Sequence, residues 1–131
     1  MVLVVDASVA VEYLLRTDLG RHIADRIERE DLVAPELLDA EVLAVLRRAW
    51  LAKRVAEVRA AEALDDLLEW SVRRIPHEAL LLEAWTFRRN VSGYDAFYLA
   101  TARLFEAPLL TADGPLARTP RTGVVVENVR V

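Results

Sequence analysis

Two aspartates follow apolar runs that are typical of buried strands. Asp6 comes directly after residues 2–5, and Asp113 comes shortly after residues 109–111. A strand that is apolar along its length is usually buried on both faces, as in a parallel sheet. Open parallel sheets bind their ligands beyond the carboxyl ends of the strands. Both carboxylates are therefore predicted to lie at a ligand-binding edge.

Two further acidic residues belong to predicted helices. At about 100° per residue, Glu41 falls beside Arg48, on the margin of the apolar stripe of a helix predicted over residues 36–53. Carboxylates are seldom buried unpaired, so a glutamate at this border either extends into solvent or has a function. Asp95 lies in the first turn of another predicted helix, three residues after Ser92.

Three of these residues also have a structural explanation when each is taken alone. Asp6 and Asp95 are placed to cap or favour a helix N-terminus. Asp113 precedes Gly114, and Asp-Gly is a common turn pair. The functional interpretation rests on the combination, because the predicted topology allows all four side chains to converge on one pocket.

A converging set of carboxylates requires a counter-charge. Two carboxylates about 4 Å apart repel by about 4 kcal/mol at an effective dielectric near 20, so a cluster must take up protons or a cation. Oxygen ligands favour Mg²⁺ or Mn²⁺ over zinc. The chain has no cysteine, and His22 and His77 have no partner at ligand spacing. The sequence thus predicts a site for Mg²⁺ or Mn²⁺.

Short apolar segments alternate with helical patterns along the chain, which predicts an α/β fold with a parallel sheet and right-handed crossovers. At 131 residues the chain fits a single domain spanning 1–131. The predicted strands are residues 3–6, 32–34, 72–75, 108–111 and 124–126. The predicted helices are residues 8–15, 19–30, 36–53, 56–68, 77–89, 92–106 and a short turn or helix ending at 118.

Bulk composition narrows the functional classes. A net charge of -4 and a pI near 5.2 argue against a broad basic face for nucleic acid, although a small local one remains possible. No apolar stretch approaches the roughly 20 residues that cross a bilayer, and nothing resembles a secretory leader. We expect a cytoplasmic protein with no membrane association.

Four blocks of residues, in this order, resemble PIN-domain ribonucleases, and among them the VapC toxins of toxin-antitoxin pairs. The blocks cover residues 4–8, 35–42, 94–102 and 109–117. The resemblance implies a PIN-like three-layer α/β/α fold with a mostly parallel five-stranded sheet. It also implies an acidic quartet that holds the metal and performs catalysis, with two hydroxyl side chains in support: Asp6, Glu41, Asp95 and Asp113, with Ser8 and Thr111.

The resemblance further implies an Mg²⁺- or Mn²⁺-dependent endoribonuclease that acts as the toxin of a type II toxin-antitoxin system. RNA would be the substrate, a cognate antitoxin the protein partner, and a homodimer the expected assembly. Arg118 and Arg121 could neutralise substrate phosphates, although a solvated loop explains them equally well.

Two other classes are compatible with parts of the pattern. A receiver-like signalling domain also binds Mg²⁺ at strand ends, but it needs a phosphate-accepting aspartate after the third strand and a late lysine. Lys53 is mid-chain, and the third predicted strand runs into Pro76. A non-catalytic PIN binding module would keep the fold and use the carboxylates only as helix caps. Metal binding distinguishes that module from an enzyme.

Overall fold

The computed structural model describes residues 1–120 and 122–130. No helix within these ranges is long and apolar enough to cross a membrane. The elements follow one another in the order β1 (Val2–Val5), α1 (Ala7–Leu14), α2 (Asp18–Arg29), β2 (Asp31–Pro35), α3 (Leu37–Leu51), α4 (Glu57–Glu69), β3 (Val72–Ile75), α5 (His77–Trp85), α6 (Gly93–Leu104), β4 (Leu109–Thr111), α7 (Gly114–Ala117) and β5 (Val126–Asn128).

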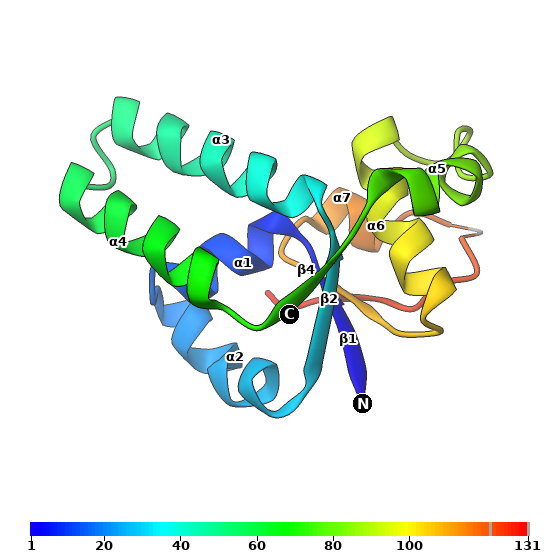
Figure 1. Cartoon of the computed structure of the whole chain (residues 1–131), viewed down its shortest axis with the longest axis horizontal. Coiled ribbons are helices and arrows are strands. Elements are labelled where there is room, and N and C mark those ends of the chain that lie inside the picture. The colour runs from blue at the N-terminus through cyan, green and yellow to red at the C-terminus, as the bar shows by residue number, and fades with distance from the viewer. Residues whose placement is uncertain (121, 131) are drawn as a thin grey trace.

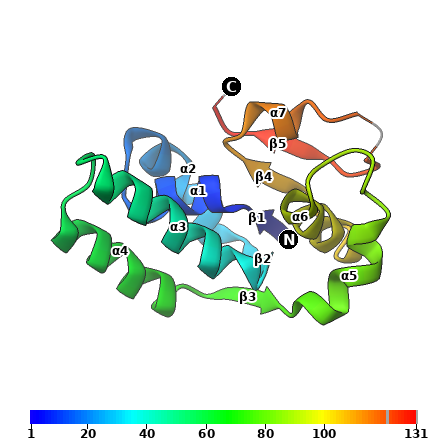
Figure 2. The same ribbon diagram turned by 90° about the horizontal axis from the view of Figure 1, so that it is seen from above.

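The five strands form one parallel sheet in the order β3-β2-β1-β4-β5. Helices α1 to α4 lie on one side of the sheet, and α5 and α6 lie on the other (Figures 1 and 2). The predicted α/β fold with three layers is confirmed, and the sheet is parallel throughout. Receiver domains have the order 2-1-3-4-5, so this strand order rules out the receiver-like alternative.

The central strands are apolar because both of their faces are covered by helices. Leu3, Val4 and Val5 in β1 and Leu109 and Leu110 in β4 are at most 1% exposed. In register, Val4 pairs with Leu109 and Val5 pairs with Leu110. The two strands therefore end side by side, and the residues that follow them begin at the same edge of the sheet.

This edge is a topological switch point. From β1 the chain crosses to β2 over one face, whereas it enters β4 from α6 on the opposite face (Figure 2). At such a point the segments leaving the two neighbouring strands diverge and open a crevice, where doubly wound folds bind ligands. Asp6 follows β1 and Asp113 follows β4, so both lie at this crevice as predicted.

Several element boundaries differ from the sequence prediction by a few residues, and two of the differences have a visible cause. The last strand was expected at residues 124–126 but covers Val126–Asn128, because the amide of Val124 is turned back to the hydroxyl of Thr122 at 3.2 Å. The helix expected to reach residue 89 ends at Trp85, where the Thr86 hydroxyl donates to the carbonyl of Glu83 at 2.6 Å. Such local bonds compete with the regular backbone ladder.

Helix α5 provides a direct test of this packing. Leu80 is fully buried in the core, whereas Leu82 on the same helix is 85% exposed. Leu80→Ala should lower the free energy of unfolding by about 2–5 kcal/mol, because it removes buried methyl groups and leaves a cavity. Leu82→Ala should change it by less than about 0.5 kcal/mol. Urea denaturation of both variants measures the difference, and equal losses would contradict this arrangement of α5.

Candidate active site

A cavity of about 530 Å³ opens at the switch point between β1 and β4. Its wall is formed by α1, by α3, by the first turns of α6 and by the segment after β4. All four predicted carboxylates line it, together with a fifth that was not predicted: Asp6, Glu12, Glu41, Asp95 and Asp113. The fold therefore brings the four predicted acidic residues, which lie up to 107 positions apart in the sequence, to one cavity.

The carboxylate of Asp6 is buried, with 6% of the residue exposed, and is held by three donors. Its Oδ1 accepts from the Ser8 hydroxyl at 2.6 Å and from the backbone amide of Val9 at 3.1 Å, while its Oδ2 accepts from the Thr111 hydroxyl. The bond to Val9 makes Asp6 the N-cap of α1. The structural and functional interpretations of Asp6 are thus compatible.

Ser8 and Thr111 connect the two strand ends as well as holding Asp6. The Ser8 hydroxyl accepts from the amide of Ala112 at 2.9 Å, and the Thr111 hydroxyl accepts from the amide of Asp113, also at 2.9 Å. Each hydroxyl therefore donates to Asp6 and accepts from the backbone beyond β4. Both residues lie where the sequence placed them, beside the carboxylate they were predicted to support.

Asp95 lies in the first turn of α6, and Asp113 is the N-cap of α7. The amide of Asp95 donates to the Ser92 hydroxyl, the N-cap of α6, at 3.2 Å, so Ser92 supplies the cap. Asp113 caps α7 through a long bond of 3.4 Å from the amide of Leu116. Both residues are half-buried, and their charges face the charge of Asp6.

Burial and mutual repulsion raise the pKa of two of these carboxyl groups. Burial raises the pKa of Asp6 above its usual value, and the charge of Asp113 adds to this effect, against the bonds from Ser8, Thr111 and Val9. Burial also raises the pKa of Asp95, and the charges of Asp113 and Asp6 raise it further, against the bond to Ser92. The cavity thus favours whatever neutralises these charges, either a proton or a cation.

Glu41 has a different environment from the three aspartates. Its Oε1 accepts from the hydroxyl of Tyr98 at 2.6 Å, which links α3 to α6 across the cavity. Burial, and then the bond to Glu41, raise the pKa of Tyr98 well above its usual value, so Tyr98 remains a donor at physiological pH. Tyr98 was missed by the sequence analysis, although its position three residues after Asp95 places both on one face of α6.

The donors at this cavity fit a hydrated Mg²⁺ or Mn²⁺ ion better than a closed metal cage. Within residues 1–120 and 122–130, no three His, Cys, Asp or Glu side chains are arranged to hold an ion together. A carboxylate has about four lone-pair positions, and the three donors to Asp6 leave one on Oδ2. Mg²⁺ commonly keeps several waters and binds through one or two carboxylates together with substrate phosphates.

Basic side chains line this cavity, but they are not the predicted ones. Arg48, Arg54 and Arg130 contribute to its wall, whereas Arg118 does not and instead lies over Gly114. Arg130 donates to the carbonyl of Ala112 at 3.0 Å and to Glu12 at 3.3 Å. The prediction for Arg121 falls outside the described residues. Arg48 could have been found from its spacing, since it follows Glu41 by seven residues, or about two helical turns.

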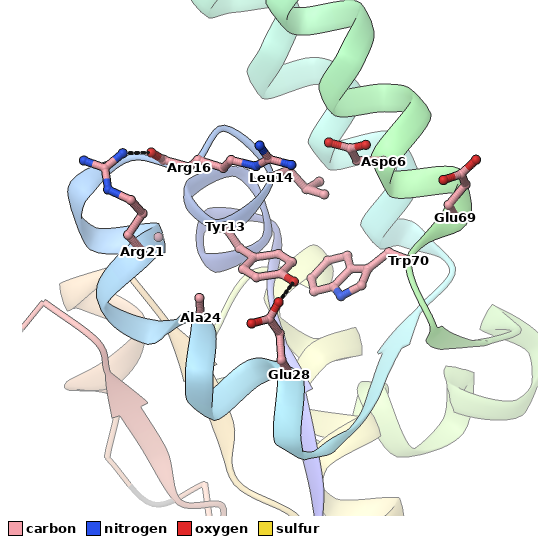
Figure 3. A pocket seen from close by; sticks show the side chains of 10 residues that line it. Tyr13, Leu14, Arg16, Arg21, Ala24, Glu28, Asp66, Glu69 and Trp70 are labelled. Atoms are coloured by element: carbon pink, nitrogen blue, oxygen red, sulfur yellow. Dashed lines mark hydrogen bonds between the residues drawn. The ribbon is translucent and has the colours of Figure 1, made fainter.

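A separate pocket of about 420 Å³ lies among α1, α2 and the end of α4 (Figure 3). The rings of Tyr13 and Trp70 stack there with centroids 5.0 Å apart, and the Tyr13 hydroxyl donates to Glu28 at 3.1 Å. Arg21 donates to the carbonyl of Arg16. These polar groups bond mainly to one another, and no member of the predicted quartet lines the pocket. The cavity at the switch point is therefore the candidate active site.

Comparison with known proteins identifies the family of this chain. The PIN domain family model matches residues 3–122. Ribonuclease VapC1 of Mycobacterium tuberculosis is 40% identical over 129 residues, which cover 97% of each chain. The chain belongs to the VapC ribonucleases of the PIN domain family. The family predicted from the sequence is confirmed.

Two further relatives support membership in the PIN domain family. Ribonuclease VapC12 of Mycobacterium tuberculosis is 32% identical over 127 residues, covering 97% of this chain and 98% of the relative. The crystal structure of PAE2754 from Pyrobaculum aerophilum superimposes with a TM-score of 0.65 and 26% identity, over 95% of this chain and 82% of that one. The similarity therefore covers nearly the whole PIN domain in both sequence and structure.

Removing the Thr111 hydroxyl tests how Asp6 is held. Thr111→Val should lower the free energy of unfolding by about 1–3 kcal/mol at pH 7, because it leaves a buried carboxylate oxygen and the amide of Asp113 without their partner. The pKa of Asp6 should rise further. Thr111→Ser keeps the hydroxyl and should lose much less. Urea denaturation of metal-free protein compares the two, and equal stability would contradict this role of the hydroxyl.

Repulsion at the site predicts that Asp95→Asn stabilises metal-free protein. A folded-state pKa above the unfolded value of about 3.9 means that protonation of Asp95 favours the fold at low pH, and that this contribution is lost as the pH rises through the raised pKa. An asparagine at this position cannot ionise, so the Asp95→Asn variant does not lose this stability as the pH rises. Its Tm should therefore exceed that of the wild type by a few degrees at pH 7, and the difference should vanish near pH 4.

Thermal melts in a chelator at several pH values measure this difference. Asp65→Asn, at an exposed position of α4, is the matched control and should leave Tm unchanged at every pH. A lower Tm for Asp95→Asn at pH 7 would show that the carboxylate mainly stabilises the first turn of α6.

Proposed function

We propose that this chain is a metal-dependent endoribonuclease that cleaves RNA at the switch-point cavity, and that it is the toxin of a type II toxin-antitoxin pair. The observation that supports this most is the buried carboxylate of Asp6, with Asp95 and Asp113 facing it in an open cavity. Its VapC relatives are named ribonucleases. Hydrolysis of a phosphodiester bond needs a neutralised, water-accessible site of this kind.

The metal would be Mg²⁺ or Mn²⁺, held first by Asp6 and Asp95. Glu41 and Asp113 would either bind it directly or orient its waters. When a metal ion occupies it, such a site would activate water at neutral pH and stabilise the leaving oxygen. The chain's own residues fix the geometry. Ser8 and Thr111 hold the Asp6 carboxylate in one orientation, and the Tyr98 hydroxyl holds Glu41 at the opposite wall.

The substrate would be an accessible RNA segment rather than a duplex. Sequence-specific RNA recognition generally targets loops and single strands, whose bases are unstacked and can be read. The cavity is open to solvent and lies among helix ends, which suits an extended strand. We place this activity in the cytoplasm, where RNA substrates of a toxin are found.

Protein partners would be a cognate antitoxin and a second copy of the chain. Large apolar side chains remain exposed on two surfaces, such as Leu43 and Trp50 beside the α3–α4 groove and Leu82 and Trp85 beside the α5–α6 groove. Exposed apolar surfaces of this kind commonly mark protein interfaces. They support both a partner protein and a homodimer.

Asp6→Asn tests the proposed chemistry. The substitution preserves shape and most hydrogen bonds but removes the charge that would hold the metal. Cleavage of RNA in Mg²⁺ should fall by more than the roughly 100-fold that loss of an outer partner of a metal ligand costs. Far-UV circular dichroism should show an unchanged fold.

Asp65→Asn serves as the control on α4, away from the cavity, and should cleave RNA like the wild type. An Asp6→Asn protein that cuts at the wild-type rate would remove Asp6 from the chemistry. Calorimetric titration of the wild type with Mn²⁺ addresses the non-catalytic alternative, since absence of binding would favour a PIN binding module.

A further inference from the structure

Two arginines lie at the α3 end of the cavity. Arg48 lies on α3 and Arg54 lies in the turn after it, and both line the same cavity as the acidic residues. Neither guanidinium group has a hydrogen bond or ion pair to any of residues 1–120 and 122–130. By contrast, Arg26, Arg74 and Arg103 are each paired with a carboxylate.

The position of Arg48 follows from the period of the helix. It comes seven residues, or about two turns, after Glu41, so both side chains project from the same face of α3. At 1.5 Å per residue they are separated by about 10 Å along the helix axis. Ala44 and Val45 line the wall between them. Arg48 therefore lies about two turns along α3 from Glu41, where it can meet a substrate that extends along this helix.

The position of Arg54 is fixed by the way α3 ends. Lys53 adopts a left-handed conformation with φ of 60°. The amide of Arg54 donates to the carbonyl of Ala49 at 2.9 Å. The amide of Lys53 donates to the carbonyl of Trp50, also at 2.9 Å. These two bonds form a Schellman motif, which turns the chain back at a defined angle. The motif directs Arg54 to the side of the cavity where Arg48 lies.

The charges of the cavity are therefore separated. Five carboxylates line it, and Arg130 is already paired with Glu12. The unpaired positive charges of Arg48 and Arg54 lie at the α3 end, on the helix pair that extends away from the sheet (Figure 1). An RNA strand that binds at the acidic end would be repelled by carboxylates that the metal does not neutralise. Positive side chains beside its flanking phosphates would offset this repulsion. The overall net charge of -4 makes such a local contact necessary.

We propose that Arg48 and Arg54 bind backbone phosphates of the RNA on one side of the scissile bond and so fix the direction in which the strand crosses the cavity. This inference rests on the proposed ribonuclease function. The guanidinium fork suits bidentate contact with phosphate oxygens. Because these contacts are made to phosphates, the two arginines set position and affinity and not base preference.

Steady-state cleavage of a single-stranded RNA oligonucleotide in Mg²⁺ tests this role. Arg48→Gln combined with Arg54→Gln should raise KM about tenfold, since hydrogen bonds to charged groups are lost. The value of kcat should stay within about twofold of the wild type. The dependence of log kcat/KM on log salt should become shallower by about 0.7 for each phosphate contact removed.

Arg29→Gln is the matched control. Arg29 carries the same charge at the exposed end of α2, does not line the cavity, and donates to the carbonyl of Asp25 in its own helix at 3.1 Å. It should leave both KM and the salt dependence near wild-type values. The combined Arg48→Lys and Arg54→Lys variant should keep the wild-type salt dependence and recover part of KM, because it keeps the charge but loses the fork.

The outcomes separate this inference from the proposed function. If the wild type cleaves RNA and the double glutamine variant matches Arg29→Gln in KM and salt dependence, Arg48 and Arg54 are solvated surface residues and the inference is wrong. If kcat falls while KM is unchanged, they act on the reaction and not on the strand. A wild type that cleaves no RNA would overturn the proposed function together with this inference.

Discussion

The structure depends on a negative charge that is buried where two parallel strands end side by side. Asp6 directly follows β1, in a region that helices cover. Its buried carboxylate is stabilised there by hydrogen bonds from Ser8, Val9 and Thr111. These bonds join β1, α1 and the end of β4, so the same contacts close the fold and build the site. Burial still raises the pKa of Asp6, and the nearby charge of Asp113 leaves the cavity in need of positive charge.

The fold and most of the site could be predicted because they depend on local patterns. The apolar runs before Asp6 and Asp113 indicate central parallel strands, and the carboxyl ends of such strands meet at one edge. The helix period placed Glu41 at the border of a buried face. The family resemblance joined these residues to Asp95. The structure places all four on one cavity, although Glu41 is bonded to Tyr98 and is not grouped with the aspartates.

Other features depend on contacts between distant residues and could not be read from local patterns. The pairing of Arg130 with Glu12 joins positions 118 residues apart. The direction of Arg54 depends on a left-handed Lys53, a conformation that no glycine marks in the sequence. The choice between Arg118 and Arg48 as cavity residues depends on how α7 turns after β4. The last strand starts late because Thr122 holds the amide of Val124, which strand propensity alone does not reveal.

The central claim is that the buried carboxylate of Asp6 and its acidic neighbours form a site that a hard divalent cation neutralises. Diffraction from crystals soaked in Mn²⁺, with data collected at the manganese absorption edge, locates such an ion directly by its anomalous signal. We expect a strong peak in the switch-point cavity within bonding distance of Asp6 Oδ2 and of Asp95. An empty cavity at Mn²⁺ concentrations that support full RNA cleavage, or a peak elsewhere on the surface alone, would contradict this claim.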